Sequence, residues 1–564
     1  MRLVGKPIPR KEGRKKVTGA ALYVDDLKFD GMLHGVTVRS SVPRGRIKSI
    51  SFDQPLATAG GTDLIPWDEF TIVTAKDIPG GNYVALILND QPYLADEVVN
   101  HPEEPIVLLA HHDKYLLEEA RRHVRIEYEE LPAVLSLDDS LARKEIIWGE
   151  DNVFKKFLVD KGNVEDVWAN ADFIVEGEYE TGAQEQLYIE NNGAIAVANP
   201  GEGVTVWGSM QCPYYVHKAL IKLFGLPEEK IRVIQTETGG GFGGKEEYPS
   251  LIAGHAALLS WKSGKPVKMI YDRAEDMVAT TKRHPSRTRH KTAVTKDGKL
   301  LAQEIEFVID GGAYCTLSPV VLSRGTIHAA GPYFCPNVRI KSTAVATNVP
   351  PHGAFRGFGA PQSIFALERQ MDKVAQAVGL TPDEFRRRNF IREGETTATN
   401  QIIREQVDLE GLMNRAFELT DFHAKRERFA QENGAHASGV QQASGLRTQK
   451  GIGFAAFMHG AGFTGSGEVY LQSVVGAEAT AAGRVKILAA STEIGQGTNT
   501  IFAQIAAEAL GLDYDLFEVT QPDTANVPNS GPTVASRTCM IVGKLVESAV
   551  LGLRQTLIGS GLLN

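Results

Sequence analysis

The sequence predicts an α/β protein with α+β parts, divided into several domains. The chain has 564 residues, of which 43% are apolar, and this is long enough for two to four domains with sizeable cores. Short apolar runs alternate with amphipathic stretches along most of the chain, which is the pattern of mixed strands and helices. The 56 glycines gather partly in a few loops, which indicates places where the backbone approaches something closely.

The N-terminal quarter is expected to form a small α/β domain over residues 20–135. A basic segment, residues 1–19, precedes it and is expected to be a solvated arm or a strand at a subunit contact. Apolar periodicity defines the expected elements of this domain. They are strands at Phe70–Val73, Tyr83–Leu88 and Val124–Tyr128, and a helix at Lys114–Arg122.

The remainder of the chain divides by composition into four stretches. A polar connector is expected first, then a long α/β region that opens with a strand at Phe173–Tyr179, and a helix is expected to begin at Pro382. A charged, glutamine-rich stretch then predicts helices and a loose linker, and a second α/β half follows it. In chain order, the connector is residues 136–171, the first α/β region is residues 172–391, the helical and linker stretch is residues 392–450, and the second α/β half is residues 451–564.

Charge and cysteine usage restrict the classes of function. The net charge of −9 argues against a nucleic-acid partner, and no run of about 18 apolar residues predicts a membrane span. The four cysteines are scattered, which fits a reducing cytoplasm and argues against a disulfide framework. An iron–sulfur cluster needs clustered thiolates, so any electrons are expected to leave to another polypeptide.

The first glycine loop, residues 239–246, follows an expected strand (Ile231–Ile234) and precedes an expected helix (Leu251–Trp261). It matches Gly-x-Gly-x-x-Gly, but no acidic residue follows where a dinucleotide site needs one. It also nearly matches a phosphate-binding loop, but Glu246 stands where magnesium binding needs Ser or Thr. A tight turn that allows close strand–helix packing remains a plain alternative for this loop taken alone.

Two further loops, residues 353–362 and 492–499, combine glycines with an aromatic residue, Arg356 or Gln496. Glycine lets backbone N–H groups converge on polar oxygens, Arg356 can anchor an anionic group, and Gln496 can both donate and accept. One large polar cofactor held between the three loops explains them more economically than three unrelated turns.

These loops resemble those of the molybdenum hydroxylase family, in its molybdopterin-binding subunit of the xanthine dehydrogenase and aldehyde oxidase type. The resemblance covers essentially the whole chain, and its motifs stand in family order. It implies that residues 20–135 are the family's α/β hammerhead domain and that the rest is a two-part molybdopterin-binding region with its second part incomplete. The motifs are Gly-Gly-Gly-Phe-Gly-Gly-Lys-Glu (239–246), Ala-Phe-Arg-Gly-Phe-Gly (354–359), Glu-Ile-Gly-Gln-Gly (493–497) and Val-Pro-Asn-Ser-Gly-Pro-Thr-Val-Ala-Ser (527–536).

The resemblance implies a molybdenum–molybdopterin cofactor, in the cytosine dinucleotide form usual in bacterial relatives. It implies no protein side chain on the metal, because the pterin dithiolene holds it. Gln211 resembles the glutamine that hydrogen-bonds a metal oxygen ligand, although an ordinary strand-end glutamine is the alternative. The cofactor contacts implied are Gln211, Phe242, Gly243, Arg356, Gln496, Ala535 and Ser536.

Five residues resemble the family's substrate contacts. Glu246 and Arg324 match the pair that orients a purine and stabilises developing charge, and they are the catalytic residues implied. Phe358, Phe463 and Thr464 match two aromatics that sandwich the ring and a neighbouring hydroxyl. A structural ion pair is the alternative for Arg324, and a plain core position is the alternative for each phenylalanine.

The implied activity is hydroxylation of a purine or related N-heterocycle with water-derived oxygen, with electrons passing to 2Fe-2S and FAD groups on partner subunits. The family's general base is a glutamate in Gly-x-Gly-Glu near the C-terminus. Residues 465–468 match that pattern but lie too early, and a turn before a strand at Val469–Leu471 is expected there. The base and the last cofactor loops are therefore expected from a second polypeptide or from a part missing from a truncated reading frame, and the chain alone is expected to be inactive on purines. An aldehyde oxidoreductase subunit and a non-catalytic or truncated cofactor-binding remnant remain the alternatives.

Overall fold

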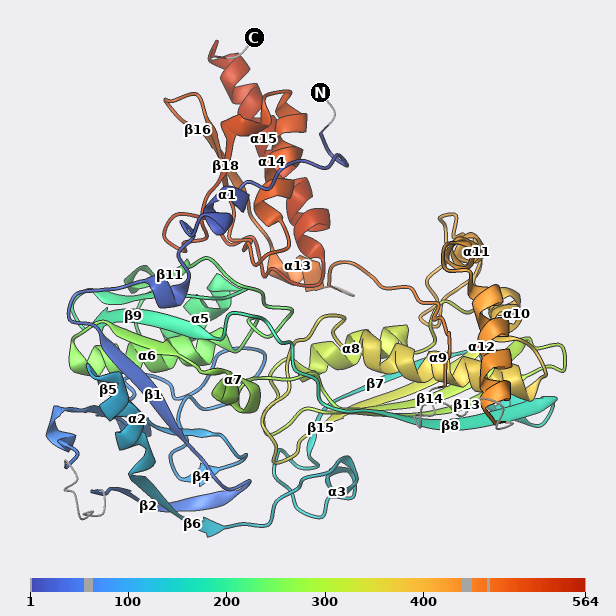
Figure 1. Cartoon of the computed structure of the whole chain (residues 1–564), viewed down its shortest axis with the longest axis horizontal. Helices are drawn as coiled ribbons and strands as arrows, with labels where there is room; N and C mark the ends of the chain where they lie inside the picture. Colours follow the sequence, from blue (N-terminus) through green and yellow to red (C-terminus); the bar gives the residue numbers. More distant parts are fainter. Residues whose placement is uncertain (1–2, 55–63, 438–448, 464–466, 563–564) are drawn as a thin grey trace.

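The computed structural model describes residues 3–54, 64–437, 449–463 and 467–562. Within these residues the chain forms two large mixed sheets and two small three-stranded sheets, with helices packed on them (Figure 1). The predicted α/β class with a hammerhead domain ahead of the cofactor-binding region is confirmed. No helix in the described part of the chain is long and apolar enough to cross a membrane.

The first large sheet joins strands from the expected N-terminal domain to strands from the region after residue 172. β1 pairs in parallel with β12, with Leu33 opposite Val267. One apolar core lies under the whole sheet and includes Leu108 and Val206, so these two parts of the chain share a core. The strand order is β11 (Ile231–Gln235), β10 (Gly203–Gly208), β9 (Gly193–Asn199), β12 (Val267–Ile270), β1 (Leu33–Arg39), β5 (Pro105–His111) and β3 (Thr71–Val73).

Two helices cover this sheet, α5 (Pro213–Phe224) and α6 (Pro249–Ser263). α6 is buried at every position from Pro249 to Ser260, so it is surrounded by protein on all sides and has no solvent-facing polar stripe over this span. It begins directly after the first glycine loop, as the sequence predicts. Because the helix is buried, its first turn is fixed in place, and this fixes the C-terminal end of the glycine loop that precedes it.

The smaller hammerhead sheet has the order β4 (Val98–Val99), β2 (Gly45–Phe52), β6 (Val124–Glu130), and α2 (Lys114–Arg122) lies beside it. The Asp113 side chain caps α2 by accepting from the backbone of Tyr115 and Leu116. α2, β3 and β6 confirm the expected elements. The expected strand at Tyr83–Leu88 is wrong, because that run is a loop in which Val84 is buried while Ile87 and Leu88 are exposed.

The second large sheet has the order β7, β15, β14, β13 and β8, and α8 and α9 lie along one face of it (Figure 1). The expected polar connector is wrong, because it contains β7 as an edge strand paired with β15. Edge strands alternate weakly and carry many charges, which hides them in a sequence. The bounds are β7 (Val153–Lys161), β8 (Phe173–Thr181), β13 (Ser286–Val294), β14 (Leu300–Asp310), β15 (Asn337–Val345), α8 (Ser318–His328), α9 (Ala360–Ala377) and α10 (Pro382–Asn389).

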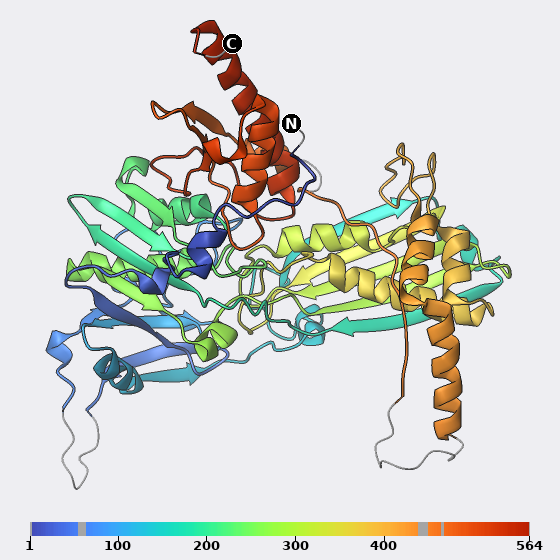
Figure 2. The ribbon, with the colours of Figure 1, turned by 45° about the horizontal axis from the view of Figure 1, so that its top comes forward.

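The C-terminal unit follows α11 (Leu409–Thr420) and α12 (Phe422–Ala437), and it has its own apolar core. Figure 2 shows this unit above the junction of the two large sheets. The expected strand at Val469–Leu471 is wrong, because Gly467–Leu471 form a short helix. Residues 465 and 466 of the turn expected before it lie outside the described residues. The elements are α13 (Gly467–Leu471), β16 (Gly476–Ala479), β17 (Val485–Leu488), α14 (Thr498–Leu510), β18 (Phe517–Val519) and α15 (Gly543–Gly559).

The basic N-terminal segment is neither a free arm nor a strand. Its backbone at Leu3 donates to Glu508 (2.6 Å), and Lys11 donates to the carbonyl of Tyr514 (2.7 Å), so it lies on the C-terminal unit. The remaining short elements are α1 (Gly13–Val17), α3 (Leu137–Leu141), α4 (Glu165–Trp168), α7 (Arg273–Ala279), the single 3-10 turns at Val24–Asp26, Trp67–Glu69, Ala75–Asp77, Glu228–Lys230 and Tyr514–Leu516, and a π-helical turn at Thr538–Val542.

Candidate functional site

Four glycine-containing segments from distant parts of the chain meet at one place. We call them loop A (239–246), loop B (353–362), loop C (492–499) and loop D (527–536). Each lies ahead of a helix: loop A precedes α6, loop B runs into α9, loop C into α14, and loop D precedes α15. Helix N-termini favour anionic groups, so the arrangement suits a ligand rich in oxygen.

Backbone hydrogen bonds join loop A to its two neighbours. The N–H of Arg356 in loop B donates to the carbonyl of Phe242 in loop A at 2.8 Å. The N–H of Gly240 in loop A donates to the carbonyl of Ile494 in loop C at 3.1 Å. Loop A is therefore the central element of the cluster.

Gln211, which follows β10, connects loop A to loops C and D. Its side-chain oxygen accepts from the N–H of Gly243 (2.9 Å), and its amide nitrogen donates to the carbonyl of Thr533 (3.0 Å). Its own carbonyl accepts from the hydroxyl of Thr492 (3.2 Å). Gln211 is buried, so the strand-end alternative of a solvated glutamine does not describe it. Its contact with a metal oxygen ligand stays a prediction.

Four of the predicted cofactor and substrate residues have an unusual backbone conformation. Phe242, Phe358, Ala535 and Ser536 all have positive φ, between 52° and 55°. Side chains rarely adopt this left-handed conformation, and its cost of about 1–3 kcal/mol per residue is usually found where function requires it. Sequence alone does not show this strain, because none of these residues is a glycine.

The side chains of two predicted cofactor residues, Gln496 and Arg356, have different surroundings. The Gln496 side chain shapes loop C, because it accepts from Ile494 (2.9 Å) and donates to Thr492 and Thr498 (3.0 and 2.7 Å). Arg356 is exposed, and its backbone carbonyl accepts from Arg283. The Arg356 guanidinium is therefore the accessible positive group of loop B.

Glu246 and Glu247 are adjacent buried carboxyl groups at the end of loop A. Burial, and then the charge of Glu247, raises the pKa of Glu246 well above its ordinary value, so the protonated form is favoured. Burial also raises the pKa of Glu247 to about 7, although the Ala354 N–H donates to its carboxylate at 3.1 Å. The sequence reasoning missed Glu247, whose only signal was a second carboxylate next to Glu246.

We expect the Glu247→Gln variant to flatten the fall of stability with rising pH. A carboxyl group whose folded pKa is raised is harder to ionise in the fold, so stability falls as pH rises from about 4.5 towards about 7. The slope lost is up to about 1.4 kcal/mol per pH unit. Urea unfolding across this pH range measures it, with the exposed residue Glu478 changed to Gln as control. An E247Q slope equal to that of the wild type would contradict the expectation.

Arg324, in α8, is buried and donates to the carbonyls of Gly460 (2.7 Å) and Gly462. No ion pair of Arg324 occurs among the described residues, and its two contacts hold the segment that ends at Phe463. The Phe463 N–H donates to Glu468 at 3.1 Å, and Phe463 is half-buried. Phe358 is also half-buried, against the apolar cluster beneath α8. Thr464 lies outside the described residues.

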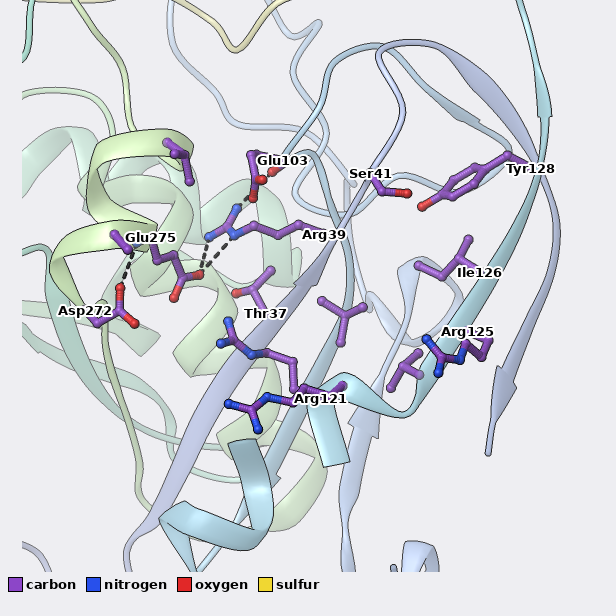
Figure 3. A pocket seen from close by; sticks show the side chains of 15 residues that line it. Thr37, Arg39, Ser41, Glu103, Arg121, Arg125, Ile126, Tyr128, Asp272 and Glu275 are labelled. Carbon is purple, nitrogen blue, oxygen red and sulfur yellow. Dashed lines mark hydrogen bonds and ion pairs between the residues drawn. The ribbon is translucent and has the colours of Figure 1, made fainter. Parts of the chain in front are cut away.

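A separate cavity of about 600 Å³ lies between β1, β6, α2 and α7 (Figure 3). Arg39 crosses it and forms an ion pair with Glu275 (2.9 Å), while it also donates to the carbonyl of Glu103. None of the predicted site residues lines this cavity. In the described parts of the chain no group of three or more His, Cys, Asp or Glu residues is arranged to hold a metal ion.

Comparison with known families accounts for nearly the whole chain. Residues 18–132 match the model described as aldehyde oxidase and xanthine dehydrogenase, a/b hammerhead domain. Residues 149–390 and 415–560 match two models described as molybdopterin cofactor-binding domains. The boundaries between these three matches fall between residues 132 and 149 and between residues 390 and 415.

A probable xanthine dehydrogenase subunit from Bacillus subtilis (strain 168) is 34% identical over 541 residues, which are 95% of this chain and 69% of the relative. Quinoline 2-oxidoreductase from Pseudomonas putida 86 has a TM-score of 0.85 at 27% identity, covering 99% of this chain and 71% of that one. Aldehyde oxidoreductase from Desulfovibrio gigas has a TM-score of 0.84 at 28% identity, covering 98% and 60%.

The three family matches and the shared fold define the class of this protein, an α/β chain with a hammerhead domain followed by molybdopterin cofactor-binding domains. The chain belongs to the molybdenum hydroxylase family, as a large subunit with molybdopterin cofactor-binding domains. It spans 60–71% of the length of the three proteins named above.

Proposed function

We propose that this chain is the molybdenum-binding subunit of a hydroxylase that oxidises a purine or a related N-heterocycle. The observation that carries the proposal is the convergence of loops A to D, joined by backbone hydrogen bonds and by Gln211. The similarity to a probable xanthine dehydrogenase subunit and to a quinoline oxidoreductase supports a heterocyclic substrate.

The residues of the four loops fit a molybdopterin. Left-handed backbone at Phe242, Gly243, Ala535 and Ser536 turns successive peptide groups towards one side, as polar cofactor oxygens require. A Cβ on Gly243 would lie 2.7 Å from the carbonyl of Ala354, so only glycine allows this approach of loops A and B. When bound, the cofactor supplies the oxidation of a substrate carbon with water-derived oxygen and carries the electrons away.

We assign the holding of the cofactor to side chains and backbone of all four loops. The cytosine dinucleotide form remains part of the proposal, and the metal ligands are expected from the pterin rather than from the protein. The residues assigned are Gln211, Phe242, Gly243, Arg356, Gln496, Ala535 and Ser536.

The proposed substrate side of the site combines Glu246 with Phe358 and Phe463. A protonated Glu246 can donate a hydrogen bond to a ring nitrogen or carbonyl of a purine, and the half-buried rings of the two phenylalanines are suited to offset stacking. Thr464 is proposed as the neighbouring hydroxyl. Arg324 then acts through the 460–463 segment, which it holds in place.

Electron transfer and proton removal are proposed to need further polypeptides. All four cysteines are free and scattered, which supports 2Fe-2S groups on a partner subunit and a cytoplasmic location. An FAD group on a further partner subunit is proposed from the resemblance to the family. Glu468, the carboxylate of the Gly-x-Gly-Glu match, is paired with buried Arg537 at 2.9 Å. This pairing argues against Glu468 as the general base and so supports a base from a second polypeptide.

An aldehyde oxidoreductase is the second candidate. The specific observation in its favour is that the Arg324 guanidinium is occupied by the carbonyls of Gly460 and Gly462, since an aldehyde needs no arginine at its edge. The fold similarity to aldehyde oxidoreductase agrees with this candidate.

The test is turnover by the chain co-expressed with its iron–sulfur and FAD subunits and with the polypeptide that supplies the general base, in ¹⁸O-labelled water. We expect hypoxanthine or quinoline to gain one labelled oxygen, and the metal content to approach one molybdenum per chain. Glu246→Leu should lower kcat/KM for a purine by about 10–100-fold, because the substrate group that the protonated carboxyl orients is left without its hydrogen-bond partner. Labelling of benzaldehyde alone, unaffected by E246L, would support the second candidate, and absence of molybdenum would exclude both.

A further inference from the structure

Lys245 is the penultimate residue of loop A, and neither the cofactor nor the substrate assignments use it. Its side chain is fully buried, and its ammonium group donates to Glu190 (3.0 Å) and to the hydroxyl of Ser209 (2.8 Å). In a nucleotide-binding loop this lysine would face a phosphate. Here it faces a carboxylate, so its partner is part of the protein.

Glu190 holds both ends of loop A. One oxygen of its carboxylate accepts from Lys245 at the end of the loop and from the N–H of Gly239 at its start (2.7 Å). The Glu190 N–H in turn donates to the carbonyl of Gly239 at 3.2 Å. A Cβ on Gly239 would lie 2.7 Å from the Cβ of Glu190, so only glycine permits this contact.

The surroundings of Lys245 make this arrangement rigid. The ammonium group lies 4.8 Å from the centre of the Tyr188 ring, and the Tyr188 hydroxyl donates to Asp276 at 2.5 Å. The Tyr188 carbonyl accepts from Arg273 at 2.7 Å. Lys245 is therefore packed inside a buried polar network, on the side of loop A where Glu190 and Tyr188 lie.

We propose that Glu190 and Lys245 form an internal clamp that fixes the two ends of loop A and so presets its strained centre for the cofactor. This inference rests on the proposed function. The centre contains Gly240, Phe242 and Gly243, all with positive φ. Such a segment keeps its conformation only when its surroundings impose it. Lys245 is thus a positioning residue, and it acts through the backbone of loop A.

The test compares Lys245→Met with Arg39→Met in the full chain with its partner subunits. Arg39 and Glu275 are a matched buried ion pair, 7% and 13% exposed, which lies at the separate cavity (Figure 3). Each variant leaves one buried carboxylate unpaired, so both should lower the unfolding temperature. Only K245M should increase hydrogen–deuterium exchange in a peptide covering residues 239–246, and only K245M should lower the molybdenum content, by about tenfold.

The double variant E190Q/K245M removes the unpaired charge in case K245M does not fold. It should regain thermal stability but keep the faster exchange in loop A and the low molybdenum content. Wild-type exchange and molybdenum content in the folded single or double variant would overturn the clamp. Equal molybdenum loss in R39M would also overturn it. If the wild type binds no molybdenum, the proposed function is wrong. The comparison of hydrogen–deuterium exchange at residues 239–246 then still tests whether Glu190 and Lys245 fix loop A.

Discussion

Replacing Gly243 with alanine is expected to abolish cofactor binding while most of the fold survives. Gly243 has φ of 105°, a conformation open to glycine but strained for other residues. An added Cβ would lie 2.7–2.9 Å from backbone atoms of Ala354 and Phe355, which cannot move aside as a side chain could. Loops A and B would separate, and the hydrogen bond from Arg356 to Phe242 would be lost.

The measurement is molybdenum content and hydroxylase activity of purified G243A, each expected to fall at least tenfold. Gly264→Ala is the matched control. Gly264 also has positive φ (68°), at the end of α6, but a Cβ there meets nothing within 4 Å. It should cost only about 1 kcal/mol of stability and leave the molybdenum content unchanged. A G243A protein with full molybdenum content would contradict the convergence of loops A and B.

Replacing Arg386 with methionine is expected to cause a large loss of stability, about 3–5 kcal/mol. Arg386 is completely buried in α10 and binds Glu368 through two nitrogens (2.9 and 3.1 Å) and Asp372 through a third (2.9 Å). Glu368 also accepts from the N–H of Ala456 (2.8 Å). Truncation leaves a buried carboxylate without its cation and loosens the segment that leads to Phe463.

Urea unfolding of the intact chain measures this effect. Arg415→Ala is the control, because its ion pair with Glu418 has both side chains more than 65% exposed and should contribute less than about 1 kcal/mol. Adding E368Q to R386M should recover part of the loss, since the unpaired charge is then removed. A loss below about 1 kcal/mol for R386M would show that this pair does not hold α9, α10 and the 449–463 segment together.

The sequence predicted those helices whose first residues are fixed by capping side chains close by in the chain. α10 begins at Pro382 after Thr381, which forms a capping box with Glu384, and α2 is capped by Asp113. β7 was missed because an edge strand needs no apolar alternation, and its charged residues have the composition of a linker. The strand predicted at Tyr83–Leu88 is wrong for the opposite reason. This run is apolar because tertiary contacts bury part of it, but it pairs with no strand among the described residues.

The sequence by itself determined the α/β class, the family and the segments that carry the candidate site, because glycine-rich motifs at fixed positions are local properties of the chain. Only the tertiary structure decided what the residues at those positions do. It placed Lys245 against Glu190, directed Arg324 to the carbonyls of Gly460 and Gly462, and buried Glu246 beside Glu247. Burial, pairing and left-handed backbone arise from contacts between segments up to about 300 residues apart, as between Gln211 and Thr533. No local pattern encodes such contacts.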